Sequence, residues 1–191
     1  MNLVEVWQRI AVWHEDNTPA GLFRLAPGAS DAEISEFETA IGNTLPADVR
    51  QSFSIHNGGL GHACLLWYEM LPLQSIFKTW QRYLEWQTNN GWGLGDDWRP
   101  FDVRGPIKPQ WWTARRIPLL DADGDHVMLD LDPPEDGTYG QIIEHSHEIG
   151  PKLVLAASWL DWLNRLADGL EAGKYVYVED EETVAPPGMY D

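Results

Sequence analysis

Residues 117–147 narrow the choice of folds more than any other part of the chain. They read IPLLDADGDHVMLDLDPPEDGTYGQIIEHSH, in which two apolar runs flank an Asp-Gly pair and a third run follows a segment rich in Pro and Gly. Asp123 and Gly124 tolerate the positive φ angles of a two-residue turn, so the first two runs predict a β-hairpin. Residues 141–147 predict a further strand of the same sheet.

Helical patterns lie on both sides of these strands. Ser30 and Glu33 form a capping box in front of an apolar stripe, and Gly42 is a natural end for that helix. The expected helices cover residues 3–11, 30–42, 46–56, 75–89 and 158–170, and short strands are expected at 63–68 and 152–155. This order predicts an α+β fold, with an antiparallel or mixed β-sheet flanked by N-terminal helices and a C-terminal helix.

The length of the chain, 191 residues, suits one domain. We expect a single domain over residues 1–178. Residues 179–191 are acidic and contain Pro186-Pro187, and they predict a flexible tail.

Acidic residues outnumber basic ones by 30 to 13, which gives a formal net charge of -17. Such a chain would repel a phosphate backbone, so we expect no nucleic-acid partner. It would attract a basic protein. No apolar run approaches the roughly 18 residues of a membrane helix, and no secretory leader is visible, so we expect a cytoplasmic protein that makes no membrane contact. Cys64 is the only cysteine, which excludes an internal disulfide and predicts a buried thiol.

No catalytic pattern stands out. The chain has no Gly-x-Ser-x-Gly elbow, and Cys64 has no helper nearby in the sequence. Asp121, Asp123 and Asp125 resemble the start of a calcium loop, but His126 stands where that loop requires Gly. His126, His145 and His147 could approach one another across strands as a zinc or iron site, but no further ligand has a fixed spacing. We therefore expect no enzyme, no cofactor, no metal site and no catalytic residue.

Four segments together resemble the SUKH superfamily, which includes the Smi/Knr cell-wall regulators of fungi and many bacterial immunity proteins. The segments are ASDAEISEFETAIGNTLPADVRQSFSIHNGG, WWTARRIPLLDADGDHVMLDLDP, YGQIIEHSHE and SWLDWLNRLADGLEAGKY. The resemblance implies an α+β fold without a known family-wide catalytic site. Bacterial members of this type are typically immunity factors that neutralise a toxin, often a nuclease, and fungal members act as scaffolds in cell-wall signalling. The lack of long low-complexity arms favours the bacterial role, and the Trp-rich segment 80–112 is less typical of the family.

The resulting hypothesis is an immunity-type protein that binds a basic toxin domain, such as a nuclease, and blocks it by occlusion. It would act as a monomer or a weak homodimer. The expected contact surface combines aromatic and acidic side chains: Trp92, Asp96, Asp97, Trp98, Trp111, Asp121, Asp123, Asp125, Glu135 and Asp136. Two alternatives remain open. One is a carbohydrate-binding or glycoside-cleaving protein that uses Trp platforms and carboxylates, and the other is a cell-wall or signalling scaffold.

Overall fold

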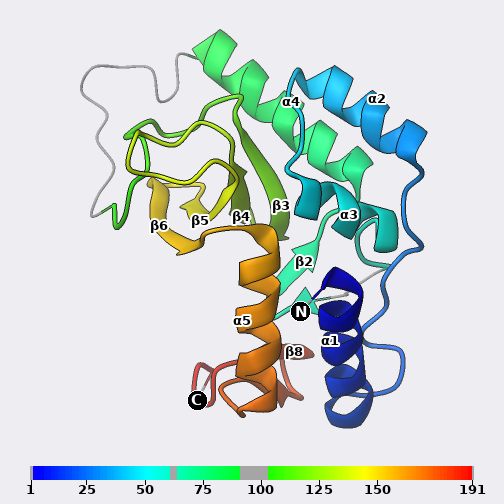
Figure 1. Ribbon diagram of the computed structural model, residues 1–191. Helices are drawn as coiled ribbons and strands as arrows, with labels where there is room; N and C mark the ends of the chain where they lie inside the picture. Colours follow the sequence, from blue (N-terminus) through cyan, green and yellow to red (C-terminus); the bar gives the residue numbers. More distant parts are fainter. Residues whose placement is uncertain (1, 61–63, 91–102, 191) are drawn as a thin grey trace.

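The computed structural model describes residues 2–60, 64–90 and 103–190, and it is a mixed structure of helices and antiparallel strands (Figure 1). The helices are α1 (Leu3–Asn17), α2 (Asp31–Ile41), α3 (Ala47–Ile55), α4 (Leu73–Asn90) and α5 (Trp159–Glu171). The strands are β1 (Cys64–Leu65), β2 (Tyr68–Met70), β3 (Arg116–Ala122), β4 (Asp125–Asp130), β5 (Gln141–Ser146), β6 (Gly150–Ala156), β7 (Val176–Val178) and β8 (Thr183–Ala185). The predicted α+β class is confirmed.

The first six strands form one antiparallel sheet in which each strand pairs with its neighbours in the sequence, in the order β1-β2-β3-β4-β5-β6. The predicted hairpin of β3 and β4 is present, and Asp123 and Gly124 both adopt positive φ angles, 51° and 92°. β6 meets a parallel bridge from Arg104, whose amide donates to the Lys152 carbonyl at 2.8 Å. Both faces of β4 are buried from His126 to Asp130, so the apolar and polar side chains of these residues are enclosed, and Asp125 is half-buried.

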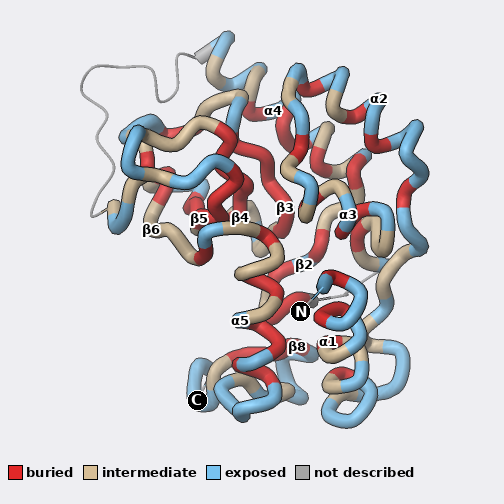
Figure 2. Tube along the Cα trace, in the orientation of Figure 1, coloured by how far each residue is buried: buried red, intermediate tan, exposed pale blue. Residues whose placement is uncertain are grey.

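Two groups of helices cover the sheet (Figure 1). α4 packs against β3, and α2 lies beside α4. α5 follows β6 and runs beside α1, and α3 contacts both of these helices. Buried residues follow the strands and the inner sides of the helices (Figure 2), as the amphipathic patterns predict.

Local signals set several helix ends as expected. The Ser30 hydroxyl accepts the Glu33 amide at 3.3 Å, and the Glu33 carboxylate accepts the Ser30 amide at 2.8 Å, which completes the predicted capping box of α2. Gly42 ends α2 in the left-handed conformation, at φ 65°. The Ser158 hydroxyl accepts the Asp161 amide at 3.1 Å at the start of α5.

The strand expected over 63–68 is wrong, because the chain turns back within it. Leu66 has a φ of 63°, and the turn at Leu66 and Trp67 separates β1 from β2, which pair with each other. α4 also begins before the expected cap at Ser75. The Asn57 side chain accepts the Leu73 amide at 2.9 Å, so a distant residue satisfies the first turn of this helix.

The segment from residue 179 onward, expected as a flexible tail, contains a strand at residues 183–185. These residues form β8, which pairs with β7, and all three are buried. β8 contacts β1, and the Thr183 hydroxyl reaches the Leu66 carbonyl at 3.4 Å. This end of the chain therefore packs onto the edge of the main sheet.

Candidate functional site

An acidic groove of about 470 Å³ lies where the β3–β4 turn meets β2 and the C-terminal strand. We call it the acidic groove, and its lining residues are Trp67, Glu69, Asp121, Ala122, Asp123, Glu181, Glu182, Thr183 and Tyr190. Five of these nine residues are carboxylic acids, and none is basic. The groove therefore presents concentrated negative charge beside two aromatic side chains.

The hairpin turn positions the central carboxylates of the groove. The Gly124 amide donates to the Asp121 carboxylate at 3.2 Å, which closes the turn and holds Asp121 at the end of β3. In the antiparallel register Asp121 lies opposite Glu69 of β2. The two carboxylates therefore place negative charge on neighbouring strands at the same side of the groove.

Asp121 is also the outer end of a buried hydrogen-bond chain. Its carboxylate lies 3.0 Å from Nε2 of His126, and Nδ1 of His126 lies 3.1 Å from the Tyr83 hydroxyl of α4. All three groups are satisfied when the Tyr83 hydroxyl donates to Nδ1 and Nε2–H donates to Asp121. These hydrogen bonds connect the groove to the core, since His126 and Tyr83 are both buried.

The charged form of Asp121 is favoured in the fold. Partial burial alone would raise the pKa of its carboxyl group. The hydrogen bonds from His126 and from the Gly124 amide outweigh that effect, so the pKa lies below its ordinary value. Burial raises the pKa of Tyr83, so its hydroxyl stays protonated and can donate to Nδ1 of His126.

The structure separates the other acids of the expected contact surface from the groove. Asp125 begins β4 and binds His147, with 2.7 Å between its carboxylate and Nδ1 and 2.9 Å to the His147 amide. Partial burial favours a higher pKa for Asp125, but these bonds hold the pKa below its ordinary value. Glu135 and Asp136 are exposed in the loop after β4, at the other end of that strand.

Trp111 does not belong to the surface, so its prediction as a contact residue is wrong. It is 2% exposed and packs edge-on against Tyr83 and His145, with ring centroids 5.3 and 5.4 Å apart. A ring that fills the space between α4 and the sheet cannot reach a partner. The remaining expected contacts, Trp92, Asp96, Asp97 and Trp98, lie outside the described residues.

The groups considered as metal ligands have other partners. His126 is bound as above, His145 Nε2 lies 2.7 Å from the Trp111 carbonyl, and His147 binds Asp125. Over residues 2–60, 64–90 and 103–190 there is no cluster of three or more His, Cys, Asp or Glu side chains with the geometry of a metal site. Nor does any helix of that part combine the length and apolar character needed to cross a membrane.

Part of the groove had no signal in the sequence. Glu181 and Glu182 belong to the acidic tail that was expected to be flexible, and only the pairing of β8 brings them to the hairpin. Glu69 is the middle residue of the unexpected strand β2, between Tyr68 and Met70. The Asp-Gly turn predicted Asp121 and Asp123, but the opposite wall of the groove depends on contacts between distant segments.

Three fungal proteins are similar to this chain in sequence. The chain is 29% identical to the "Cell wall biosynthesis/cell cycle regulator smi1" of Schizosaccharomyces pombe, over 94% of this chain and 38% of that protein. It is 26% identical to the "Glucan synthesis regulatory protein" of Neurospora crassa, over 91% of this chain and 39% of that protein. It is 24% identical to the "Cell wall assembly regulator SMI1" of Saccharomyces cerevisiae, over 92% of this chain and 42% of that protein.

These three names describe regulators and not enzymes, and the chain spans about two fifths of the length of these relatives. The model of the SMI1 / KNR4 family (SUKH-1) matches residues 28–165, which run from the segment before α2 into α5 and include the whole six-stranded sheet. The chain therefore belongs to the SMI1 / KNR4 family (SUKH-1).

Proposed function

We propose that this chain is the binding domain of a regulator of cell-wall assembly or glucan synthesis, and that it acts by contact with another protein. The observation that carries this proposal is the similarity, over more than nine tenths of the chain, to three fungal proteins named as such regulators. A regulator needs a surface that recognises a partner, and it needs no reaction centre.

The acidic groove is the surface that we assign to this contact. A partner segment with Lys or Arg side chains would be steered to it by charge, and the net charge of -17 strengthens that attraction at long range. Trp67 and Tyr190 provide aromatic area at the same place, and such residues are enriched where proteins bind each other. The partner is then a protein with a basic segment.

The immunity hypothesis shares this surface but has less support. A basic toxin domain would also be attracted to the groove, yet the relatives are named for cell-wall regulation. The carbohydrate hypothesis relied on exposed Trp platforms. Among the described tryptophans, Trp86 alone is an exposed large hydrophobic residue, at 40%, and most of the others belong to the core. The cell-wall scaffold hypothesis therefore has more support than the immunity hypothesis and the carbohydrate hypothesis.

A domain exchange tests the proposal. In a Neurospora crassa strain that lacks its glucan synthesis regulatory protein, a chimaera would carry this chain in place of the matching segment of that protein. We expect the chimaera to restore the rate at which radiolabelled glucose enters wall glucan, whereas the same protein with the segment deleted would not. A chimaera that is present at normal level but behaves like the deletion would refute the assignment.

A further inference from the structure

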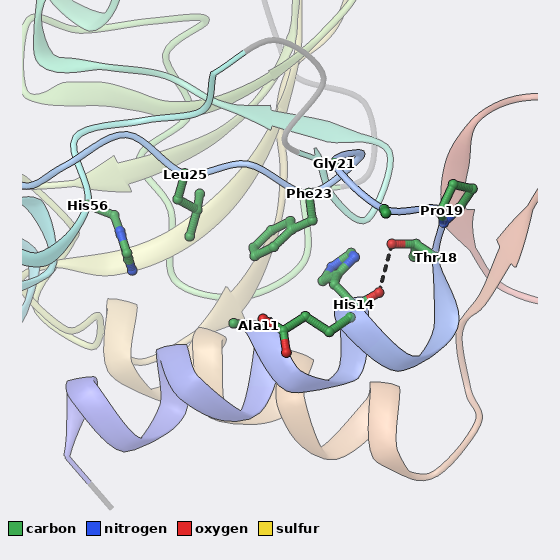
Figure 3. Close-up of a pocket in the computed structure, with 10 residues that line it drawn as sticks. Ala11, His14, Thr18, Pro19, Gly21, Phe23, Leu25 and His56 are labelled. Atoms are coloured by element: carbon green, nitrogen blue, oxygen red, sulfur yellow. Dashed lines mark hydrogen bonds between the residues drawn. The ribbon is translucent and has the colours of Figure 1, made fainter.

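A second pocket, remote from the acidic groove, lies between the end of α1 and the segment that follows it. Its volume is about 440 Å³, within the range of small-molecule sites. Figure 3 shows its walls: Ala11 and His14 from α1, Phe23 and Leu25 from the following segment, and His56 from the end of α3. It shares no lining residue with the acidic groove.

His14 is the unusual member of this pocket. It projects from α1 into the pocket (Figure 3), is only 4% exposed, and its Nδ1 has no hydrogen-bond partner in the described part of the chain. Nδ1 is itself enclosed, so a ligand in the pocket would meet the other ring nitrogen, Nε2. Buried polar groups are almost always paired, so an imidazole without a partner beside a cavity indicates a site that a ligand can complete. The Thr18 hydroxyl donates to the His14 carbonyl at 2.8 Å and makes no hydrogen bond with Nδ1.

Packing fixes the plane of the His14 ring. Phe23 stacks on the ring at 4.0 Å between centroids, with 4° between the planes, and Trp13 meets it edge-on at 5.2 Å. The imidazole therefore offers its hydrogen bond in a set direction beside flat aromatic and aliphatic walls. Such an arrangement is suited to a ring that carries one polar group.

The charges around the pocket limit the ligand further. Among the described residues that line the pocket, Glu15 alone is charged, so an anionic ligand such as a phosphate or a carboxylate would be repelled. His56, the other polar ring, already has its Nδ1 at 3.3 Å from the Ala26 carbonyl. A ligand with many hydroxyl groups would leave most of them without partners, whereas a single hydroxyl can be satisfied by His14.

We propose that this pocket binds a phenolic ring, with the ring against Phe23, Ala11 and Leu25 and the hydroxyl hydrogen-bonded to Nε2 of the His14 imidazole. The phenol can belong to a tyrosine side chain of another polypeptide or to a free small molecule, and the chemistry of recognition is the same. The inference goes beyond the regulatory contact assigned to the acidic groove. All lining residues except His56 precede the segment that matches the family model.

Nuclear magnetic resonance titration of the isotopically labelled full chain tests the proposal, with 4-methylphenol and toluene as probes. We expect 4-methylphenol to shift the signals of Ala11, His14 and Phe23 and to bind more tightly than toluene. His14→Phe keeps an aromatic ring but removes the hydrogen bond. It should weaken the affinity for 4-methylphenol about fivefold to tenfold and leave the affinity for toluene unchanged.

Ala11→Phe fills the pocket and should abolish binding of both probes. The control, His147→Phe, alters a histidine outside the pocket and should change neither.

A capped Gly-Tyr-Gly peptide separates the two sources of the phenol. Tighter binding of the peptide than of 4-methylphenol assigns the site to a polypeptide, and weaker binding assigns it to a small molecule. Equal affinities for 4-methylphenol and toluene, or an unchanged affinity in His14→Phe, would overturn the proposal. A test of the folded state by unfolding in urea keeps the variants comparable.

Discussion

A single serine hydroxyl in α3 accepts hydrogen bonds from two buried indoles, and its removal should lower the free energy of unfolding. Ser52 is fully buried, and its Oγ accepts Nε1–H of Trp7 at 3.2 Å and Nε1–H of Trp159 at 2.9 Å. Ser52→Ala would leave two buried donors without an acceptor, each at a cost of about 1–3 kcal/mol. We expect a loss of about 2 kcal/mol or more in the free energy of unfolding, measured in urea.

Ser54→Ala in the same helix is the matched control. Ser54 is exposed, and its hydroxyl donates to the Gln51 carbonyl one turn back. A surface substitution of this kind changes stability by about 0.5 kcal/mol or less. Equal losses in the two variants would contradict the role of Ser52 as a shared acceptor.

Among the single elements, α2 offers a test of its capping box, which should add to the stability of the fold. Ser30→Ala removes the hydroxyl that accepts the Glu33 amide and donates to the Glu33 carboxylate, whereas the backbone amide of residue 30 can still donate to that carboxylate. We expect a loss of about 1 kcal/mol in the free energy of unfolding. Ser35→Ala, in the body of the same helix and exposed, should cost less. A loss at Ser30 no greater than that at Ser35 would show that the cap contributes nothing.

The elements that the sequence predicted correctly are those whose ends depend on neighbouring residues. Ser30, Gly42 and the Asp123-Gly124 turn act within a few residues of themselves, so the pattern alone was sufficient. The start of α4 depends on Asn57, sixteen positions before the amide that it accepts. β8 depends on β7 and on the edge strand β1, which lies more than one hundred residues away in the sequence. No local pattern contains that information.

At the scale of the whole molecule, two buried histidines should make the fold sensitive to acid. Burial lowers the pKa of His14 to about 4 and that of His145 to about 3. An unfolded histidine titrates near 6.5, so below that pH the unfolded chain binds protons that the folded chain does not. Stability is therefore complete above about pH 6.5 and declines as the pH falls, with about 3 kcal/mol lost through His14 by pH 4.

Urea unfolding from pH 7 to pH 5 checks this expectation. The wild-type chain should lose stability across the window, and His14→Phe should lose measurably less, because that variant cannot take up the proton. The large negative charge acts in the opposite direction as carboxylates are neutralised, but it acts equally on both proteins. Parallel pH profiles for the two proteins would contradict the assignment of His14 as a buried neutral group.

The acidic groove could be predicted only in part, because it is assembled from three distant segments. Asp121 and Asp123 come from a turn that the sequence marks, whereas Glu69 and Glu181 reach it only through the pairing of β2 and the packing of β8. The composition gave the sign of the charge but not its place. For Trp111 the prediction was wrong in another way. Its polar neighbours in the sequence predicted a surface position, but its ring is buried in the core.

Neutralisation of the groove in the Neurospora chimaera tests whether the negative charge of the groove is needed for the regulatory contact. Asp123→Asn, Glu181→Gln and Glu182→Gln together remove three negative charges from the groove and leave Asp121 bound to His126. Glu135→Gln with Asp136→Asn removes charge from an exposed loop outside the groove, as the control. We expect the groove variant to remain folded but to lose the restoration of glucan synthesis, while the control restores it fully. Restoration by the groove variant at the level of the unaltered chimaera would show that the regulatory contact does not depend on the acidic groove.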